Sequence, residues 1–199
     1  MKASAIKVLM LNYEYPPLGG GAANANYYLI KEFSNFADLD IELITSHNNI
    51  KSTVEKFAEN IKIHFLPVKK KQLHYWTEKE VLSYSWQAFS YLKGLVNREK
   101  FDLCHCFFAL PCGWLASRFQ SSFSYIVSLR GSDVPGFNQR LQIYNWLLKP
   151  VFRRVLDKAA AVIANSEDLK TLALKSWTGK IEVIPNGVDS NQFAPNSHF

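Results

Sequence analysis

Two short segments of the sequence combine residue types that bind phosphate. The run Gly19, Gly20 and Gly21 precedes a predicted helix, where free backbone N–H groups and the helix dipole favour an anion. Arg130 and Asp133 share the segment Arg-Gly-Ser-Asp, and an arginine can clamp a phosphate or a carboxylate with two hydrogen bonds. Each segment also has a purely structural interpretation. The glycines would form a flexible turn into the helix, and Arg130 would pair with Asp133 to close a turn.

The glycine run matches neither of the common nucleotide-binding motifs. Ala22, Ala23 and Asn24 follow it, so the fingerprint Gly-x-Gly-x-x-Gly is incomplete, and the lysine of the P-loop is missing. The glycines therefore predict a phosphate contact without identifying a nucleotide.

Three further segments each allow two interpretations. Ser166 and Glu167 suit the start of a helix, where Ser caps and Glu favours the first turn, but a glutamate there can also bind sugar hydroxyls. Asn186-Gly187 is a turn signal. Cys104-His105-Cys106 lacks the usual Cys-x2-Cys spacing of zinc sites, and cysteine is common in buried strands, so we expect a strand and no metal.

The lysines Lys69, Lys70 and Lys71 precede a segment rich in Tyr, Trp and Phe. Lysines beside aromatic residues suit an anionic lipid surface, and they also suit nucleic acid or a solvated loop beside a core-facing helix. The formal net charge of +6 fits nucleic acid, anionic lipid or a phosphorylated substrate, and the charge alone does not choose among them.

Apolar strand-like runs alternate with helical patterns along the chain. This alternation predicts βαβ units and a doubly wound, mostly parallel, Rossmann-like α/β sheet of about seven strands. The predicted strands are Ile6–Leu11, Asp40–Ser46, Ile61–Pro67, Phe101–Phe108, Ser124–Leu129, Ala160–Ala164 and Ile181–Ile184. The predicted helices are Ala22–Phe36, Glu78–Lys100, Gly113–Phe119, Gln139–Lys158 with a bend at Pro150, and Glu167–Lys175.

These elements form one domain over residues 1–186, and 187–199 has the composition of a linker. No apolar run approaches the ~20 residues of a membrane-spanning helix, and no cleavage site follows the first apolar run. The three cysteines argue against a disulfide framework. We therefore expect a cytoplasmic protein.

Ligands of open parallel sheets bind outside the carboxyl ends of the strands. Glycine, small polar and charged residues follow the predicted strands, which places the candidate site at one edge of the sheet. The residues expected there are Tyr15, Gly19, Gly20, Gly21, His47, Phe108, Arg130, Asp133, Ser166, Glu167 and Asn186.

Four segments in this order resemble the N-terminal domain of a GT-B, family 4 (group 1) retaining glycosyltransferase. They are Tyr-Pro-Pro-x-Gly-Gly-Gly-Ala from Tyr15, Arg-Gly-Ser-Asp from Arg130, Ala-Asn-Ser-Glu-x-Leu-Lys from Ala164, and Ile-Pro-Asn-Gly-Val-Asp-x-x-x-Phe-x-Pro from Ile184. The resemblance implies an acceptor-side domain facing a second Rossmann-like domain, which binds the nucleotide sugar, carries a Glu-x7-Glu motif and is absent from this sequence.

The resemblance also implies roles for residues. Gly20 and Gly21 would face the donor diphosphate, and Ser166 and Glu167 would line the cleft. Arg130 stands where many relatives have the histidine of His-Gly-x-Asp. Arginine cannot act as a base near neutrality, but it can stabilise the charge of the departing phosphate while Asp133 orients it or meets the acceptor.

The implied reaction is retaining transfer to a hydroxyl of a polysaccharide or lipid-linked acceptor. It requires no metal and no cofactor beyond the nucleotide-sugar donor, and it involves no nucleic acid. We expect the domain to be inactive alone. Two alternatives stay open: a GT-B sugar-nucleotide epimerase or hydrolase, and a non-catalytic module that binds a phosphorylated sugar or a membrane surface.

Overall fold

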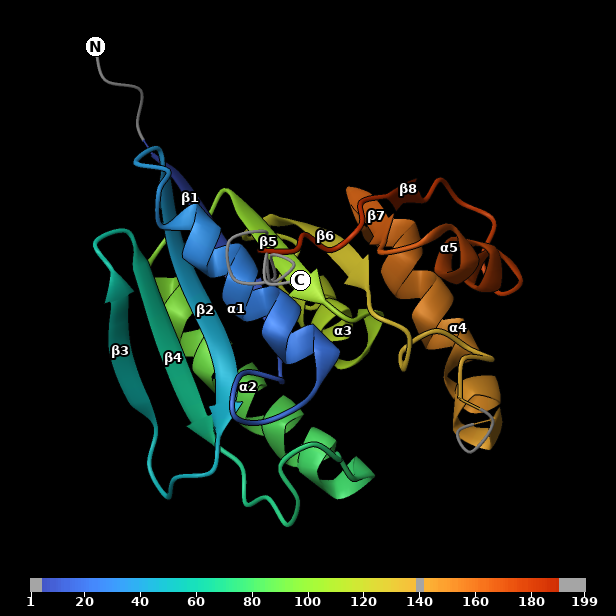
Figure 1. Ribbon diagram of the computed structural model, residues 1–199, viewed down its shortest axis with the longest axis horizontal. Helices are drawn as coiled ribbons and strands as arrows, with labels where there is room; N and C mark the ends of the chain where they lie inside the picture. The colour runs from blue at the N-terminus through green and yellow to red at the C-terminus, as the bar shows by residue number, and fades with distance from the viewer. Residues whose placement is uncertain (1–4, 139–141, 190–199) are drawn as a thin grey trace, which may run out of the picture.

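The computed structural model describes residues 5–138 and 142–189 of the chain. They form one eight-stranded sheet in the order β3-β4-β2-β1-β5-β6-β7-β8, with helices on its faces (Figure 1). The strands are β1 (Ile6–Leu11), β2 (Leu39–His47), β3 (Thr53–Ala58), β4 (Ile61–Pro67), β5 (Leu103–Phe107), β6 (Ser124–Leu129), β7 (Ala161–Ala164) and β8 (Glu182–Val183). The helices are α1 (Gly21–Phe33), α2 (Glu78–Arg98), the π-type turn η1 (Ala109–Gly113), α3 (Trp114–Ser117), α4 (Gln142–Lys158) and α5 (Glu167–Leu174).

The strand pairings confirm the predicted doubly wound fold. β1 lies between β2 and β5 and pairs with both in parallel, and the pairs β2–β4, β5–β6, β6–β7 and β7–β8 are also parallel. The carboxyl ends of these strands therefore lie along one edge of the sheet, which is the edge where ligands bind in this architecture.

β3 is the strand that the sequence analysis missed. It pairs antiparallel with β4 at the edge of the sheet, and its first four residues are exposed. An exposed edge strand with Glu55 and Lys56 at its centre lacks the apolar run that identifies a buried strand. The sheet consequently has eight strands, where about seven were predicted.

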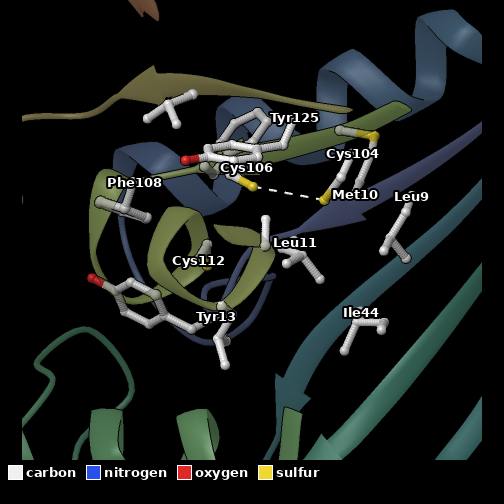
Figure 2. Close-up of a cluster of buried hydrophobic side chains, with 14 of the residues drawn as sticks. Leu9, Met10, Leu11, Tyr13, Ile44, Cys104, Cys106, Phe108, Cys112 and Tyr125 are labelled. Atoms are coloured by element: carbon white, nitrogen blue, oxygen red, sulfur yellow. Dashed lines mark hydrogen bonds between the residues drawn. The ribbon is translucent and has the colours of Figure 1, made fainter. Parts of the chain in front are cut away.

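Helices cover both faces of the sheet. Figure 1 shows α1 on the near face and α2 behind the sheet, and α3 contacts both α2 and α4. The α2 layer packs on a core in which Leu9, Met10 and Leu11 of β1 are completely buried, as are Tyr84 and Cys104. Figure 2 shows part of this core, with a contact of 3.7 Å between Cys104 Sγ and Cys106 Sγ.

The cysteine segment is the buried strand that its composition predicted. Cys104, Cys106 and Cys112 are free thiols in the core, and burial raises the pKa of Cys106 and Cys112 well above the usual range. In a strand, His105 must point to the opposite face from its two neighbours. One metal ion therefore could not be held by all three side chains without breaking the strand.

Local signals define the helix starts. Thr77 caps α2 in a capping box with Glu80, and Ser166 caps α5 by accepting a hydrogen bond from the Leu169 N–H at 3.2 Å. The helix predicted over Gly113–Phe119 is shorter than expected, since α3 spans Trp114–Ser117 and the turn η1 precedes it. Residues 139–141 and 190–199, which include parts of the predicted fourth long helix and of the linker, lie outside the described residues. Over the described parts of the chain, no helix has the length and apolar character needed to cross a membrane.

Candidate active site at the carboxyl edge of the sheet

The sheet brings several of the predicted site residues together at its carboxyl edge. Arg130 follows β6 and donates a hydrogen bond from Nη1 to Asn186 Oδ1 at 2.8 Å, which joins the ends of β6 and β8. The backbone N–H of Ala109, which follows β5, donates to Asp133 Oδ2 at 2.6 Å. The structure therefore brings Arg130, Asp133, Phe108 and Asn186 together at one edge of the sheet, and their roles in binding or catalysis stay predictions.

The Arg-Gly-Ser-Asp segment forms a turn around a buried carboxylate. Asp133 is 8% exposed, and its Oδ1 accepts hydrogen bonds from the N–H groups of Arg130 at 3.0 Å and Gly131 at 3.1 Å. Burial raises the pKa of Asp133, and the backbone N–H groups oppose that rise. Asp133 therefore holds the backbone of the turn, whereas the structural interpretation from the sequence paired it with the Arg130 side chain.

Gly131 is required by the shape of this turn. Its φ is +116°, a conformation that residues with a Cβ rarely adopt, and a Cβ here would lie 2.7 Å from Cζ of Phe137. Glycine therefore suits this position of the turn, and the turn sets where Arg130 leaves the sheet.

The guanidinium of Arg130 is a half-buried cation with unused hydrogen-bonding capacity. It lies over the Phe107 ring, with Cζ 4.0 Å from the ring centroid, while its Nε is buried and has no hydrogen-bond partner. Burial lowers the pKa of Arg130 to about 10, and Asp133 opposes that shift, so the group stays charged near neutral pH. Polar groups buried without a partner are rare, and they occur where a ligand or water completes them.

A neutral histidine lies behind this cation. His105 Nε2 is 2.8 Å from Ser128 Oγ, and its ring centroid is 5.0 Å from that of Phe107. Burial and the charge of Arg130 lower the pKa of His105 to about 3. This histidine therefore gains no proton near neutrality and supports the position of Phe107 and Arg130 without acting as an acid there.

Phe108 carries the one positive φ found on a non-glycine residue in the described chain. Its φ is 73° and its ψ is 136°, and its side chain is 2% exposed with its ring centroid 4.7 Å from that of Tyr13. Such a conformation costs of order 1–3 kcal/mol and persists where the surroundings enforce it, frequently at ligand-binding sites. The strain lies directly between β5 and the N–H that Asp133 accepts, which supports a functional role for this edge.

The glycine loop between β1 and α1 is open. A Cβ on Gly20 or Gly21 would have no neighbour within 4 Å, whereas one on Gly19, at φ +98°, would lie 2.7 Å from Glu14 Cβ. The Gly20 N–H donates to Glu14 Oε2 at 3.2 Å. The loop therefore leaves room for a ligand at Gly20 and Gly21, although a carboxylate occupies one of its N–H groups in this structure.

The remaining predicted site residues have mainly structural contacts. The Tyr15 ring is 7% exposed and lies 5.7 Å from Phe65, and His47 Nδ1 accepts a hydrogen bond from the Asn49 N–H at 3.0 Å. Ser166 caps α5, and the exposed side chain of Glu167 pairs with Lys170 at 3.2 Å. Roles for these four residues in binding an acceptor stay predictions.

Lys70 must be removed from the predicted membrane contact. Its side chain is buried, with Nζ 3.0 Å from Glu80 Oε2 and 3.8 Å from the Trp76 ring centroid. Lys69 and Lys71 are exposed, as the sequence analysis expected. The sequence could not reveal that Glu80, ten positions further on, withdraws the central lysine of the run from the surface.

Sequence reasoning missed two residues that hold the glycine loop, Glu14 within it and His74 in the segment before α2. Glu14 follows β1 directly, so its position was an available signal, and its burial raises its pKa while the Gly20 N–H opposes that rise. His74 Nδ1 donates to the Gly19 carbonyl at 2.7 Å, and the Gly19 N–H donates to the Leu73 carbonyl at 2.8 Å. No pattern in the sequence connects His74 with a loop 55 residues away.

The sheet order and this edge define a Rossmann-like half of the GT-B type. Residues 19–192 match the family model described as Glycosyltransferase Family 4, and the chain therefore belongs to glycosyltransferase family 4. A search of curated protein sequences gives no significant match.

Solved structures agree with this assignment of the fold. A sucrose-phosphate synthase from Thermosynechococcus elongatus superposes with a TM-score of 0.73 at 15% identity, covering 96% of this chain and 50% of that one. A shorter chain of that protein gives a TM-score of 0.63 at 13% identity, with 92% and 90% covered. An E. coli protein described as trehalose-6-phosphate bound with UDP-2-fluoro glucose gives 0.55 at 12% identity, with 94% and 50% covered. The chain thus spans about half the length of the whole enzymes to which it is similar.

Proposed function

We propose that this chain is the acceptor-side half of a retaining glycosyltransferase that moves a sugar from a nucleotide-sugar donor to a hydroxyl of a polysaccharide or lipid-linked acceptor. The donor would be held mainly by a second domain, so the chain alone would not turn over. Family membership supports the transferase assignment, and the arrangement of Arg130 supports the position of the reaction.

The observation that carries the proposal is the fixed cation at the carboxyl edge. Arg130 is positioned by the turn around Asp133, by Asn186 and by the Phe107 ring, and its Nε is unpartnered. When a sugar leaves a nucleoside diphosphate, negative charge develops on the departing phosphate. A fixed cation stabilises such charge without having to reorganise during the reaction.

The glycine loop supplies the second part of the proposed donor contact. Gly20 and Gly21 leave their surroundings open, so a diphosphate can approach the backbone closely at the start of α1. An incoming phosphate would displace the Glu14 carboxylate from the Gly20 N–H. Asp133 would act through the turn, because its carboxylate accepts hydrogen bonds from the backbone N–H groups of Ala109, Arg130 and Gly131.

The proposal includes a reaction without metal or cofactor and a cytoplasmic location. Three buried cysteines with free thiols fit a reducing compartment, where disulfides are rare. Contact with a membrane surface belongs to the same proposal, because a lipid-linked acceptor lies at that surface.

The test uses the full-length enzyme that contains this domain, with a nucleotide sugar and a soluble acceptor. Arg130→Ala should lower kcat by about 10²–10³-fold, the usual loss when one charge-stabilising donor is removed. The exposed Arg118 provides a matched control, and Arg118→Ala should leave turnover unchanged. Unaltered turnover in Arg130→Ala would exclude the proposed role of Arg130.

The product distinguishes the alternative reactions. The proposed reaction gives a new glycosidic bond with the anomeric configuration of the donor, which NMR of the product reports. Epimerised or hydrolysed donor formed without any acceptor would instead identify the epimerase or hydrolase alternative.

A further inference from the structure

The outer side of α2 carries large apolar side chains that the described chain leaves partly or largely exposed, although the Phe89 ring centroid lies 5.4 Å from that of Phe119. Leu82 is 68% exposed, Trp86 78% and Phe89 36%. These positions are separated by four and three residues, so they lie along one side of the helix. The opposite side of α2 buries Tyr84, Ala88, Leu92 and Leu95 in the core. The helix thus has two apolar sides, and packing within the domain explains only one of them.

The charges around this stripe are almost all positive. Between residues 81 and 97 of α2 the one ionisable cation is Lys93, and there is no Asp or Glu. Lys79 and Lys93 therefore stand at the two ends of the stripe formed by Leu82, Trp86 and Phe89. An apolar stripe with lysines at its ends and no carboxylate is typical of a helix that lies on an anionic membrane. The apolar side chains then contact the acyl chains, and the lysines contact the anionic headgroups.

A hollow beside the start of α2 gathers further lysines. It has a volume of about 460 Å³, and Lys69, Lys71 and Lys79 are among the residues that line it, together with Glu78 and Glu80. Glu80 forms an ion pair with Lys70. Two backbone N–H groups and Lys70 lower the pKa of Glu80 to about 2, although burial alone would raise it. Three exposed lysines therefore face one free carboxylate, that of Glu78.

We propose that the outer side of α2, with the lysines Lys69, Lys71, Lys79 and Lys93, docks on an anionic phospholipid membrane. Trp86 would lie at the level of the headgroups with Leu82 and Phe89 below it, since tryptophan is enriched at that depth. Lysines near such a surface are attracted to anionic headgroups. The charge complementarity selects this occupant over a second copy of the chain, whose α2 would present the same positive charges.

The docking face has a direct connection to the candidate active site. α2 begins at the carboxyl edge of the sheet, where the Tyr13 and Trp76 ring centroids are 4.9 Å apart. The segment before α2 also binds the glycine loop, through Leu73 and His74 on the two polar groups of Gly19. Docking would thus hold the cleft against the bilayer. Access to a lipid-linked acceptor follows from this only if the proposed function holds, whereas the docking itself does not depend on it.

The first test is co-sedimentation of the protein with vesicles of phosphatidylcholine, with and without phosphatidylglycerol. We expect binding to the anionic vesicles that weakens as salt is raised, and much weaker binding to phosphatidylcholine alone. The double variant Leu82→Ser with Trp86→Ser should bind at least about tenfold more weakly, because it removes two large apolar side chains from the contact. Ile50→Ser with Val54→Ser is the matched control, since both residues are exposed apolar residues near the β3 edge, 95% and 56% respectively.

The second test separates charge from apolar contact. Lys79→Gln with Lys93→Gln should weaken binding by about fivefold for each lysine at low salt. Lys51→Gln, an exposed lysine outside this face, should leave binding unchanged. The substituted residues are exposed, so we expect every variant to fold. Circular dichroism and thermal unfolding that match those of the wild type would show this.

Three results would overturn the proposal. The first is no binding to anionic vesicles at low salt. The second is a loss of vesicle binding in the control variants equal to that in the α2 variants. The third is a concentration-dependent dimer that binds no vesicles and that the Leu82 and Trp86 substitutions dissociate. Turnover on a soluble acceptor keeps the two proposals apart. The α2 variants should retain that turnover, whereas Arg130→Ala should lose turnover and still bind vesicles.

Discussion

The Arg-Gly-Ser-Asp turn and the glycine loop lie at the same edge of the sheet, but they are held in opposite ways. In the turn, a buried carboxylate accepts three backbone N–H groups, those of Ala109, Arg130 and Gly131, and Gly131 has a φ of +116°, which disfavours a residue with a Cβ. In the loop, Gly20 and Gly21 are exposed with open space around them, and one side-chain carboxylate, that of Glu14, accepts the Gly20 N–H.

This difference suggests a division of labour between the two segments. The turn fixes the direction of Arg130 before any ligand arrives, which is what charge stabilisation in a transition state requires. The loop keeps its N–H groups near the surface, where they can be rearranged around a ligand at little cost. Substitutions in the turn should therefore reduce folding stability, and substitutions in the open part of the loop should not.

The largest effect is expected for Asp133→Ala. The change leaves three N–H groups at a buried position without their acceptor, and each such group costs about 1–3 kcal/mol. We therefore expect the free energy of unfolding to fall by at least about 3 kcal/mol in urea denaturation. Asp168→Ala, an exposed aspartate in the first turn of α5, should stay within about 1 kcal/mol of the wild type. A loss in Asp133→Ala no greater than in this control would mean that the turn is not held by the carboxylate.

The two glycine positions provide the most direct comparison of turn and loop. Gly131→Ala introduces a Cβ at φ +116° and against the Phe137 ring, so it should destabilise the protein by about 1–3 kcal/mol. Gly20→Ala places its Cβ in open space and should change stability by less than about 0.5 kcal/mol. Thermal unfolding of the two variants side by side measures the difference. Equal destabilisation would show that the loop is as constrained as the turn.

Part of this comparison could be predicted from the sequence. The parallel strands follow from their apolar runs, and parallel strands place their carboxyl ends together, so the meeting of Arg130 with Asn186 required only the fold class. The partner of Asp133 could not be predicted in the same way. Arg130 is the nearest cation in the sequence, but the carboxylate binds N–H groups, and one of them comes from Ala109 on another strand end.

Other features depended on contacts between distant segments. Lys70 and Glu80 are both surface residue types, and only the fold of the loop between β4 and α2 buries them together. The positive φ of Phe108 arises because the chain must leave β5 and enter η1 at once, and phenylalanine itself gives no signal for it. Sequence patterns predict which face of a helix or strand is buried. The burial of Lys70 with Glu80 and the conformation of Phe108 depend instead on which other segment packs there.

The smallest expected effect tests the single carboxylate that closes the loop. Burial raises the pKa of Glu14, and the Gly20 N–H and the charge of Lys70 oppose that rise. A folded-state pKa above the unfolded value of about 4.3 means that the folded protein binds more protons, so unfolding free energy falls as pH rises through the titration of Glu14. Glu14→Gln should remove that part of the slope and change stability by less than about 1 kcal/mol.

Urea denaturation of both proteins across the acidic to neutral range measures this slope. The two stability curves should converge at the acidic end, where a protonated Glu14 is as uncharged as Gln, and they should separate as pH rises. The separation should favour Glu14→Gln at neutral pH, because the variant buries no charge beside the Gly20 N–H. Parallel curves would show that solvent already hydrates the Glu14 carboxylate. The carboxylate that accepts the Gly20 N–H would then carry no burial cost, and the loop would differ still more from the turn around the buried Asp133.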